Sequence, residues 1–400
     1  MRILQGADGW WCLSGTRVAH LPIDAAVAAT GDSPITLSAK AHSTLAAAGF
    51  FTPRPTRTYS LTVLSSTGCN LGCSYCFQNV HSTAPGNFAP ERIALRRLDE
   101  PTIADIITFT RDAMDRAGLR DLKVLLFGGE PLLNPGGCLM LLEQANKIGM
   151  TSAEMVSNAV LLTPDLAREL ENRKLERIQV TFDGDQTTHD QIRTTRNGRG
   201  TFKTILANVS RAAEVTQLRW QFRINVSHRN NFSVPDLINT LAQTVDPSKC
   251  TINIAMINDV GIGYSNELRY SEDFREEYLS WHLAILDHGF SLPTPRAEFH
   301  CDYCSEKRGR VGAVVNADGT LYSSWETVGR PGMEVGSAQD GYLSDDIIDQ
   351  RWHACGYNAA PHGDPQQAQA FHDRVDAAIL DAMRERSALH SHSKNATASP

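Results

Sequence analysis

The sequence predicts an α/β protein built on a partial (β/α)6 barrel, with a small N-terminal segment and a loop-rich C-terminal region. Two observations predict this fold. Six apolar, strand-like segments alternate with helical patterns between residues 59 and 257, and such alternation forms right-handed βαβ units in a parallel sheet. Glycine-rich and polar motifs follow four of these strands, at the strand ends where barrels of this kind carry their chemistry.

Each element is predicted from its own pattern. Apolar residues recur at helical spacing in 103–117, 138–148, 202–209 and 235–241. Thr163 and Pro164 have the composition of a helix start, with Thr163 as the N-cap. The six predicted strands are 59–65, 122–127, 152–156, 177–182, 220–226 and 251–257.

The chain divides into five parts by composition. Residues 1–57 form an N-terminal segment with a short hairpin and a short helix. This pattern resembles the leading segments of peptide-modifying enzymes, which implies leader-peptide binding, and the alternative is an extension that caps an edge of the barrel. The barrel follows and is closed by a last helix near residues 274–289. The other parts are a loop-rich region with an Asp-Gly hairpin turn, a helix and a disordered tail. The boundaries are 1–57, 58–292, 293–363, 364–386 and 387–400.

Composition excludes two classes of partner. The balance of 38 basic against 45 acidic residues gives a net charge of −7, which argues against nucleic-acid and membrane-surface binding. No apolar stretch is long enough to cross a bilayer, and the first residues do not resemble a signal peptide. We expect a cytoplasmic protein, in which the grouped cysteines among the nine hold metal rather than form disulfides.

Three cysteines lie on the loop after the first strand: Cys69, Cys73 and Cys76. Their spacing lets three thiolates bind one iron-sulfur cluster and leaves its fourth iron without a protein ligand. An open iron is a place for a substrate to bind. A zinc site is the alternative, but zinc normally takes four ligands and no fourth cysteine or suitably spaced histidine lies close by.

Together with four later motifs, this triad resembles the radical S-adenosylmethionine (SAM) superfamily, and most closely its peptide maturases with a C-terminal SPASM or twitch domain. The resemblance implies a [4Fe-4S] cluster, with Tyr75 as part of its surroundings, and SAM bound at the open iron. The matching motifs are Cys69–Cys76, Gly128-Gly129-Glu130-Pro131, Val156-Ser157-Asn158, Thr181-Phe182-Asp183-Gly184 and His189-Asp190-Gln191-Ile192-Arg193.

The resemblance also implies which residues hold SAM. The backbone of Gly128 and Gly129 is expected near the SAM amino group, with Glu130 beside it as an anion. Ser157 and Asn158 are expected near the ribose or the carboxylate, although Ser-Asn-Ala departs from the usual Thr-Asn-Gly. Arg223 is expected to pair with the carboxylate. Each motif taken singly could be an ordinary turn or surface residue. Asp183, His189, Asp190 and Arg193 are expected to shape the barrel opening.

A second cysteine group lies in the C-terminal region: Cys301, Cys304 and Cys355. In SPASM-like proteins a further cysteine commonly follows the hairpin, whereas this chain has Ser324 there. Several interpretations stay open. The group could hold an auxiliary iron-sulfur cluster with three ligands, or with Cys250 or a substrate atom as a fourth. It could also hold a structural zinc ion, or no metal at all.

The function implied by the resemblance is an oxidoreductase that cleaves SAM reductively to a 5'-deoxyadenosyl radical. The radical would abstract hydrogen from a residue of a ribosomally made precursor peptide and give a crosslinked, epimerised or otherwise oxidised product. The expected partners are that peptide and an electron donor such as flavodoxin or ferredoxin. The alternatives are a sulfatase-maturase-like or small-molecule radical SAM enzyme, and a non-catalytic iron-sulfur redox sensor.

Overall fold

A computed structural model describes residues 1–27, 35–52, 56–73, 75–76, 78, 93–257, 266–297, 301, 303–304, 306–356 and 364–396. The chain forms two compact units. The first unit contains Met1–Pro55, Leu268–His300 and Pro361–Pro400, and the second contains Thr56–Glu267 and Cys301–Ala360. The second unit therefore carries the predicted barrel and both predicted cysteine groups.

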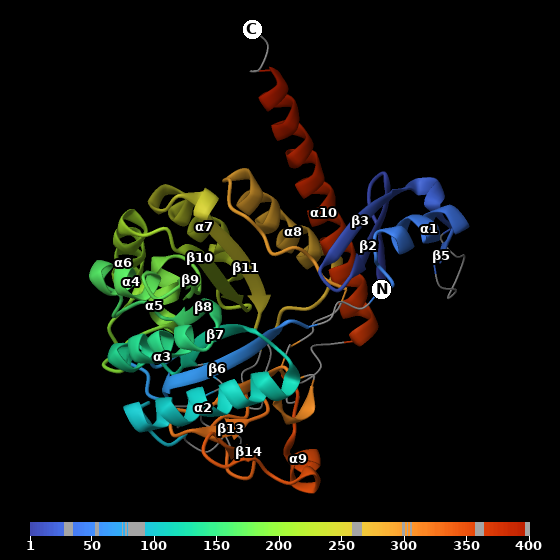
Figure 1. Cartoon of the computed structure of the whole chain (residues 1–400). Coiled ribbons are helices and arrows are strands. Elements are labelled where there is room, and N and C mark those ends of the chain that lie inside the picture. The colour runs from blue at the N-terminus through green and yellow to red at the C-terminus, as the bar shows by residue number, and fades with distance from the viewer. Residues whose placement is uncertain are drawn as a thin grey trace. The chain divides into compact units, whose positions relative to one another are not determined.

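The second unit is built on a ten-stranded sheet, and its first six strands confirm the predicted βαβ series (Figure 1). These six strands pair in parallel and lie in chain order, so every connection winds in the same direction. The sheet does not close on itself, which confirms a partial barrel. The strands are β6 (Thr58–Ser66), β7 (Asp121–Gly128), β8 (Met150–Ser157), β9 (Leu175–Phe182), β10 (Arg219–Val226) and β11 (Cys250–Met256).

Within the described residues, six α-helices connect these strands. Thr163 is the N-cap of α4, as predicted, and its hydroxyl accepts a hydrogen bond of 3.2 Å from the Leu166 amide. The structure adds the short α5, which the sequence pattern did not predict. The helices are α2 (Glu100–Ala117), α3 (Pro135–Lys147), α4 (Pro164–Glu171), α5 (Gln186–Ile192), α6 (Phe202–Val215) and α7 (Val234–Thr244), and the short 3-10 helices of this unit are η2 (Pro131–Leu133), η3 (Asn231–Ser233), η4 (Pro247–Lys249) and η5 (Lys307–Gly309).

The two faces of the sheet differ in exposure. On β10 the side chains of Phe222 and Ile224 are fully buried, whereas those of Arg223 and Asn225 are half-buried. Phe222 contacts Phe182 of β9, which in turn packs on Phe202 of α6, so the buried face lies under the helices. The opposite face is partly open and polar, as the interior face of an open barrel would be.

The C-terminal region extends the same sheet. β12 (Gly312–Val315) pairs in parallel with β6, and β13 (Thr320–Tyr322), β14 (Glu334–Ser337) and β15 (Gly341–Tyr342) add to it in antiparallel order. The predicted Asp-Gly turn joins β12 to β13, with Gly319 at φ +82°. α9 (Asp345–Arg351) follows. The region expected to be loop-rich is thus continuous with the barrel sheet.

The first unit begins with a three-stranded antiparallel sheet. The sequence predicts a hairpin here, and the structure contains it as β2 (Gly9–Ser14) and β3 (Arg17–Pro22), with β1 (Arg2–Gln5) paired to β2. The predicted short helix is α1 (Ala39–Ala47), capped by Ser38. The smaller elements are η1 (Ile23–Ala25), β4 (Ala26–Val27) and β5 (Thr36–Leu37).

The last two long helices differ from the sequence prediction. α8 (Glu272–Asp287) belongs to the first unit and packs on α10 (Pro365–Ala396), where the rings of Phe274 and Phe371 stack with centroids 5.7 Å apart. The sequence predicted that this helix closes the barrel, whereas the structure assigns it to the first unit, where its aromatic side chains meet α10. α10 also continues to Ala396, beyond the predicted end at residue 386, since no glycine or proline interrupts residues 387–396. Residues 397–400 of the predicted tail lie outside the described residues.

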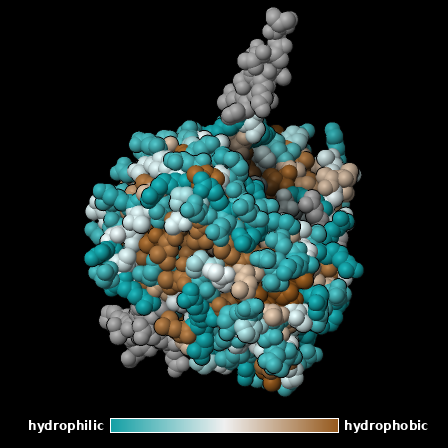
Figure 2. All heavy atoms as spheres, turned by 60° about the vertical axis from the view of Figure 1, so that its left-hand side comes forward, coloured by the Kyte–Doolittle hydropathy of each residue, from teal (hydrophilic) through white to brown (hydrophobic). Residues whose placement is uncertain are grey.

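The surface in Figure 2 is mainly hydrophilic, with apolar residues gathered in one area of this face. Many apolar atoms lie on the surface of any folded protein, so this area alone assigns no function. Among the helices of the described residues, none combines the length and the apolar character needed to cross a bilayer.

We predict that Phe222→Ala lowers the free energy of unfolding by about 3–5 kcal/mol, because it leaves a cavity between β9, β10 and α6. The matched control is Phe232→Ala, since Phe232 is 68% exposed in the same unit. Its expected effect is within about 0.5 kcal/mol. Chemical unfolding followed by circular dichroism measures both. Equal losses in the two variants would contradict the assignment of Phe222 to the core.

Candidate functional site

The cysteine loop starts where β6 ends. Cys69, Cys73 and Cys76 are all half-buried and lie close enough for their charges to interact. The Leu71 amide donates a hydrogen bond of 3.4 Å to the Cys69 sulfur, a contact that stabilises a metal-bound thiolate. The structure thus brings the predicted thiols together on one loop.

Burial disfavours the thiolate form of Cys69 and Cys73. Burial raises the pKa of Cys69 to about 12 and that of Cys73 to about 11, although the Arg193 guanidinium acts in the opposite direction on Cys73. Cysteine binds metal as the thiolate, so loading of this site must release protons.

The Gly-Gly-Glu turn lies directly against the cysteine loop. The Gly129 amide donates to the Ser66 carbonyl over 2.9 Å, and the Glu130 amide donates to the Gly68 carbonyl over 2.8 Å. A Cβ on Gly128 would lie 2.2 Å from the Ser66 oxygen, and one on Gly129 would lie 2.4 Å from the Gly68 oxygen. The two glycines are therefore required for this close backbone contact. Since an amino group donates hydrogen bonds, the predicted contact with SAM would have to use carbonyl oxygens of this turn.

Glu130 joins the turn to the end of β8. Its side chain is fully buried, and its carboxylate accepts hydrogen bonds from the Leu132 amide (2.9 Å), the Ser157 hydroxyl (2.7 Å) and the Asn158 amide (2.7 Å). Burial raises the pKa of Glu130, and these hydrogen bonds counteract the rise. Glu130 and Ser157 thus contact each other, and the structure gives both a positioning role beneath the loops.

Asn158 connects this carboxylate to the cysteine loop. Its side-chain amide donates to the Asn70 side-chain oxygen over 2.8 Å and to the Cys69 sulfur over 3.7 Å. Its own side-chain oxygen accepts from the Val160 amide over 3.0 Å. The predicted residues of β7 and β8 therefore meet the first thiol of the triad through Asn158. Asn70 is a further residue of this contact, and the sequence analysis missed it.

Tyr75 anchors the other end of the cysteine loop. Its hydroxyl donates to the Asp183 carboxylate over 2.5 Å and accepts from Arg193 over 2.7 Å and from Asn225 over 3.1 Å. The Arg193 and Asp183 side chains are 3.6 Å apart, and both are nearly inaccessible. Burial raises the pKa of Asp183, and the Arg193 charge lowers it. Tyr75 is thus a hydrogen-bonded support for the loop as well as a neighbour of the thiols.

Arg223 reaches this network through Asn225. The Arg223 side chain donates to the Asn225 side-chain oxygen over 2.7 Å, and the two residues lie on the half-buried face of β10. Asn225 was missed in the sequence analysis. Its spacing of two residues from Arg223 was an available signal, because residues two apart in a strand share a face.

His189 and Asp190 contact residues that surround the site. The Asp183 amide donates to the His189 ring over 3.3 Å, and burial lowers the pKa of His189 well below its ordinary value. Asp190 accepts hydrogen bonds from the amides of Thr201 and Phe202 at the start of α6. These contacts are with Asp183 and with the start of α6, and the role of both residues at the opening stays a prediction.

The second cysteine group also assembles. The sulfurs of Cys301, Cys304 and Cys355 all lie within 4.8 Å of one another. Cys250 does not join them among the described contacts, since its thiol donates to the Asp246 carbonyl over 3.2 Å at the start of β11. The expectation that Cys250 completes a cluster receives no support from this contact. Ser324 is fully buried, and its hydroxyl has no hydrogen-bond partner among the described residues.

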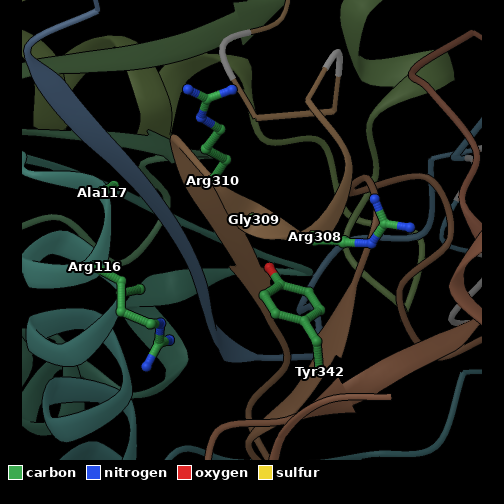
Figure 3. A pocket seen from close by; sticks show the side chains of 7 residues that line it. Arg116, Ala117, Arg308, Gly309, Arg310 and Tyr342 are labelled. Carbon is green, nitrogen blue, oxygen red and sulfur yellow. The ribbon is translucent and has the colours of Figure 1, made fainter. Parts of the chain in front are cut away.

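A separate pocket of about 210 Å³ lies between the end of α2, η5 and β15 (Figure 3). Arg116, Arg308 and Arg310 line it around Tyr342, but their guanidinium groups point in different directions. Arg308 is paired with Asp345 over 2.6 Å. These arginines do not converge on one ligand, and the pocket contains none of the predicted site residues.

We predict that Tyr75→Phe destabilises the protein by about 1–3 kcal/mol, because it removes a hydroxyl to which Asp183, Arg193 and Asn225 are bonded. The variant should also retain less iron after purification than the wild type. Tyr59→Phe is the matched control, since the Tyr59 hydroxyl is buried but has no hydrogen-bond partner among the described residues. Unfolding free energy and iron per chain are the measurements. Indistinguishable values for the two variants would show that Tyr75 does not support the loop.

Comparisons with known proteins agree with this geometry. A family model described as "Radical SAM superfamily" matches residues 63–239. The chain is 31% identical over 128 residues to a GTP 3',8-cyclase from Picosynechococcus sp., covering 31% of this chain and 34% of the relative. It is 26% identical over 164 residues to an AdoMet-dependent heme synthase from Methanosarcina barkeri, covering 41% of each chain. The chain thus spans well under half the length of these curated relatives.

The fold is similar to that of solved structures. Native anSMEcpe with bound AdoMet superposes with a TM-score of 0.57 at 14% identity, over 81% of this chain and 98% of that chain. The same protein with bound AdoMet and Cp18Cys peptide superposes with a TM-score of 0.55 at 14% identity, over 81% and 98% of the two chains. At this identity the likeness concerns the fold. Residues 63–239 of this chain thus match the radical SAM superfamily, and the position of the cysteine loop within them agrees with that match.

Proposed function

We propose that this protein is a radical SAM enzyme that modifies a ribosomally made precursor peptide. Radical SAM proteins use a [4Fe-4S] cluster and SAM, and residues 63–239 of this chain match their superfamily. The observation that carries the proposal is the chain of contacts from the cysteine loop through Asn158 to the buried Glu130. It connects the loop that would hold the cluster with the ends of β7 and β8.

The donors of the cysteine loop fit an iron-sulfur cluster. Soft thiolates are the ligands such clusters take, and three of them on one loop leave one iron open. The N–H groups of Leu71 and Asn158 are directed at the Cys69 sulfur. Hydrogen bonds of this kind to a ligating sulfur help to set the reduction potential of a cluster. When bound, the cluster supplies one electron for cleavage of SAM, and the 5'-deoxyadenosyl radical so formed takes a hydrogen atom from substrate carbon.

The residues around the loop have distinct tasks in this proposal. Glu130, Ser157 and Asn158 fix the position of the turn relative to the cysteine loop. Ser157 and Asn158 donate to the Glu130 carboxylate, and Asn158 also donates to Asn70 of the loop. Arg223, on the half-buried face of β10, would pair with the carboxylate of bound SAM. A carbonyl oxygen of the Gly128–Gly129 turn would accept a hydrogen bond from its amino group. Tyr75 holds the loop at its other end.

The open face of the sheet suits a peptide substrate. Beyond Arg223 and Asn225 it carries Glu154 and Arg177, which form an ion pair of 2.5 Å. Both side chains are partly exposed, so an extended chain could exchange hydrogen bonds with them. The similar fold of anSMEcpe holds a peptide together with AdoMet, which supports this substrate class. We assign leader-peptide binding to residues 1–57 and electron delivery to a flavodoxin or ferredoxin, in a reducing compartment such as the cytoplasm.

We predict that Cys73→Ala abolishes formation of 5'-deoxyadenosine by the anaerobically reduced protein, because a thiolate of the cluster is lost. Cys250→Ala is the matched control and should retain this activity, since Cys250 is a buried thiol at the other edge of the parallel strands. Chromatography of the nucleoside product and iron analysis measure both variants. Retained SAM cleavage in Cys73→Ala would remove the loop from its proposed role. Absence of cleavage in the wild type would favour a redox sensor.

A small-molecule substrate is the second candidate, because the chain resembles a GTP 3',8-cyclase over 128 residues. We predict that a short peptide encoded beside the gene and co-expressed with the enzyme changes in mass, or gains deuterium in D2O. Mass spectrometry detects both, and co-expression with Cys73→Ala is the control. An unchanged peptide together with consumption of GTP by the purified enzyme would favour the second candidate.

A further inference from the structure

We propose that Cys301, Cys304 and Cys355 bind a single zinc ion, rather than an auxiliary iron-sulfur cluster. The inference is independent of the substrate and concerns a site that the SAM chemistry does not use. It starts from the distances between the three sulfurs, all of which are within 4.8 Å.

This spacing fits one shared ion. Zinc binds thiolates at about 2.3 Å in a tetrahedron, which places its sulfurs about 3.8 Å apart. In a four-iron cluster each thiolate binds a different iron, so the sulfurs are separated by the width of the cluster and two iron–sulfur bonds. Three sulfurs that already lie within 4.8 Å of one another would have to move apart to take such a cluster.

The number of donors favours the same conclusion. No fourth cysteine, histidine or carboxylate joins the group within the part of the chain that the structure describes. Ser324 occupies the position at which a fourth thiolate is expected for a cluster, and a serine hydroxyl is a poor ligand for iron beside thiolates. Zinc usually takes four protein ligands, but it also binds three with water in the fourth position, and the three sulfurs here lie close enough together to share one ion.

The three thiols are partly or fully buried, and their surroundings contact the sulfurs. The Cys355 amide donates to the Cys304 sulfur over 3.5 Å, and the Trp352 indole donates to the Cys304 carbonyl over 2.9 Å. Tyr303 is 8% exposed and lies close enough to interact with Cys301, yet its hydroxyl has no other partner among the described residues. A thiolate or a metal-bound water would satisfy this buried hydroxyl.

Such an ion would stabilise the region next to the SAM site. It would join the loop at Cys301–Cys304 to the segment at Cys355, which are more than forty residues apart in sequence. The enclosed region contains Trp325, whose ring stacks on Phe127 with centroids 5.4 Å apart. Phe127 directly precedes the Gly-Gly-Glu turn on β7. The zinc site thus supports the packing behind this turn.

The test is metal analysis of the full chain with its first site removed. In the triple variant Cys69→Ala, Cys73→Ala, Cys76→Ala we expect about one zinc per chain and no acid-labile sulfide after reconstitution with iron, sulfide and zinc. Adding Cys304→Ser should remove the zinc, whereas adding Cys250→Ser should not. About four irons with sulfide in the triple variant, or no bound metal, would overturn the proposal.

A spectroscopic test that starts from the wild-type chain applies even if the triple variant fails to fold. Cobalt added to the metal-free wild-type chain should give the intense thiolate-to-cobalt absorption of a tetrahedral site, and zinc should displace it. If zinc does not displace the cobalt, or if the absorption is lost in Cys69→Ala but kept in Cys304→Ser, the ion is bound elsewhere and the proposal is wrong.

Discussion

The arrangement of the site depends on one buried carboxylate. Glu130 is inaccessible to solvent, and a charge in that position is tolerated only when its oxygens are hydrogen-bonded. Leu132, Ser157 and Asn158 supply those bonds. Because two of these donors lie at the end of β8, the carboxylate fixes the distance between the ends of β7 and β8. The side-chain amide of Asn158 donates to the Cys69 sulfur, so the position of the first thiol of the cysteine loop depends on the same carboxylate.

The same constraint explains why the motifs have the residue types they have. The turn before Glu130 must lie against the cysteine loop, and only glycine leaves room for the backbone oxygens of Ser66 and Gly68. At the other end of the loop, Tyr75 meets Asp183 and Arg193, an acid and a base that are buried as a pair. The loop is therefore held at both ends by polar contacts that are shielded from water, which is a rigid support for a cluster.

The sequence alone predicted the six parallel strands, because each is a short apolar run that ends at a glycine or polar residue. It also predicted that the motifs share one edge, since parallel strands end together. It could not show that β12 pairs with β6 or that α8 packs on α10, because such pairings join segments far apart in the chain and leave no local pattern. The internal use of Glu130 was missed for a related reason. The motif identifies Glu130 as a candidate residue. Whether its side chain is buried and hydrogen-bonded depends on Ser157 and Asn158 at the end of the neighbouring strand.

In the function proposed here, the cysteine loop presents an open iron to SAM beside the Gly-Gly-Glu turn. Electron paramagnetic resonance of the reduced, reconstituted protein tests it most directly, because a ligand bound to one iron changes the spectrum of the cluster. We expect the spectrum of a [4Fe-4S] cluster whose g-values shift when SAM is added. A cluster spectrum that is identical with and without saturating SAM would contradict the account.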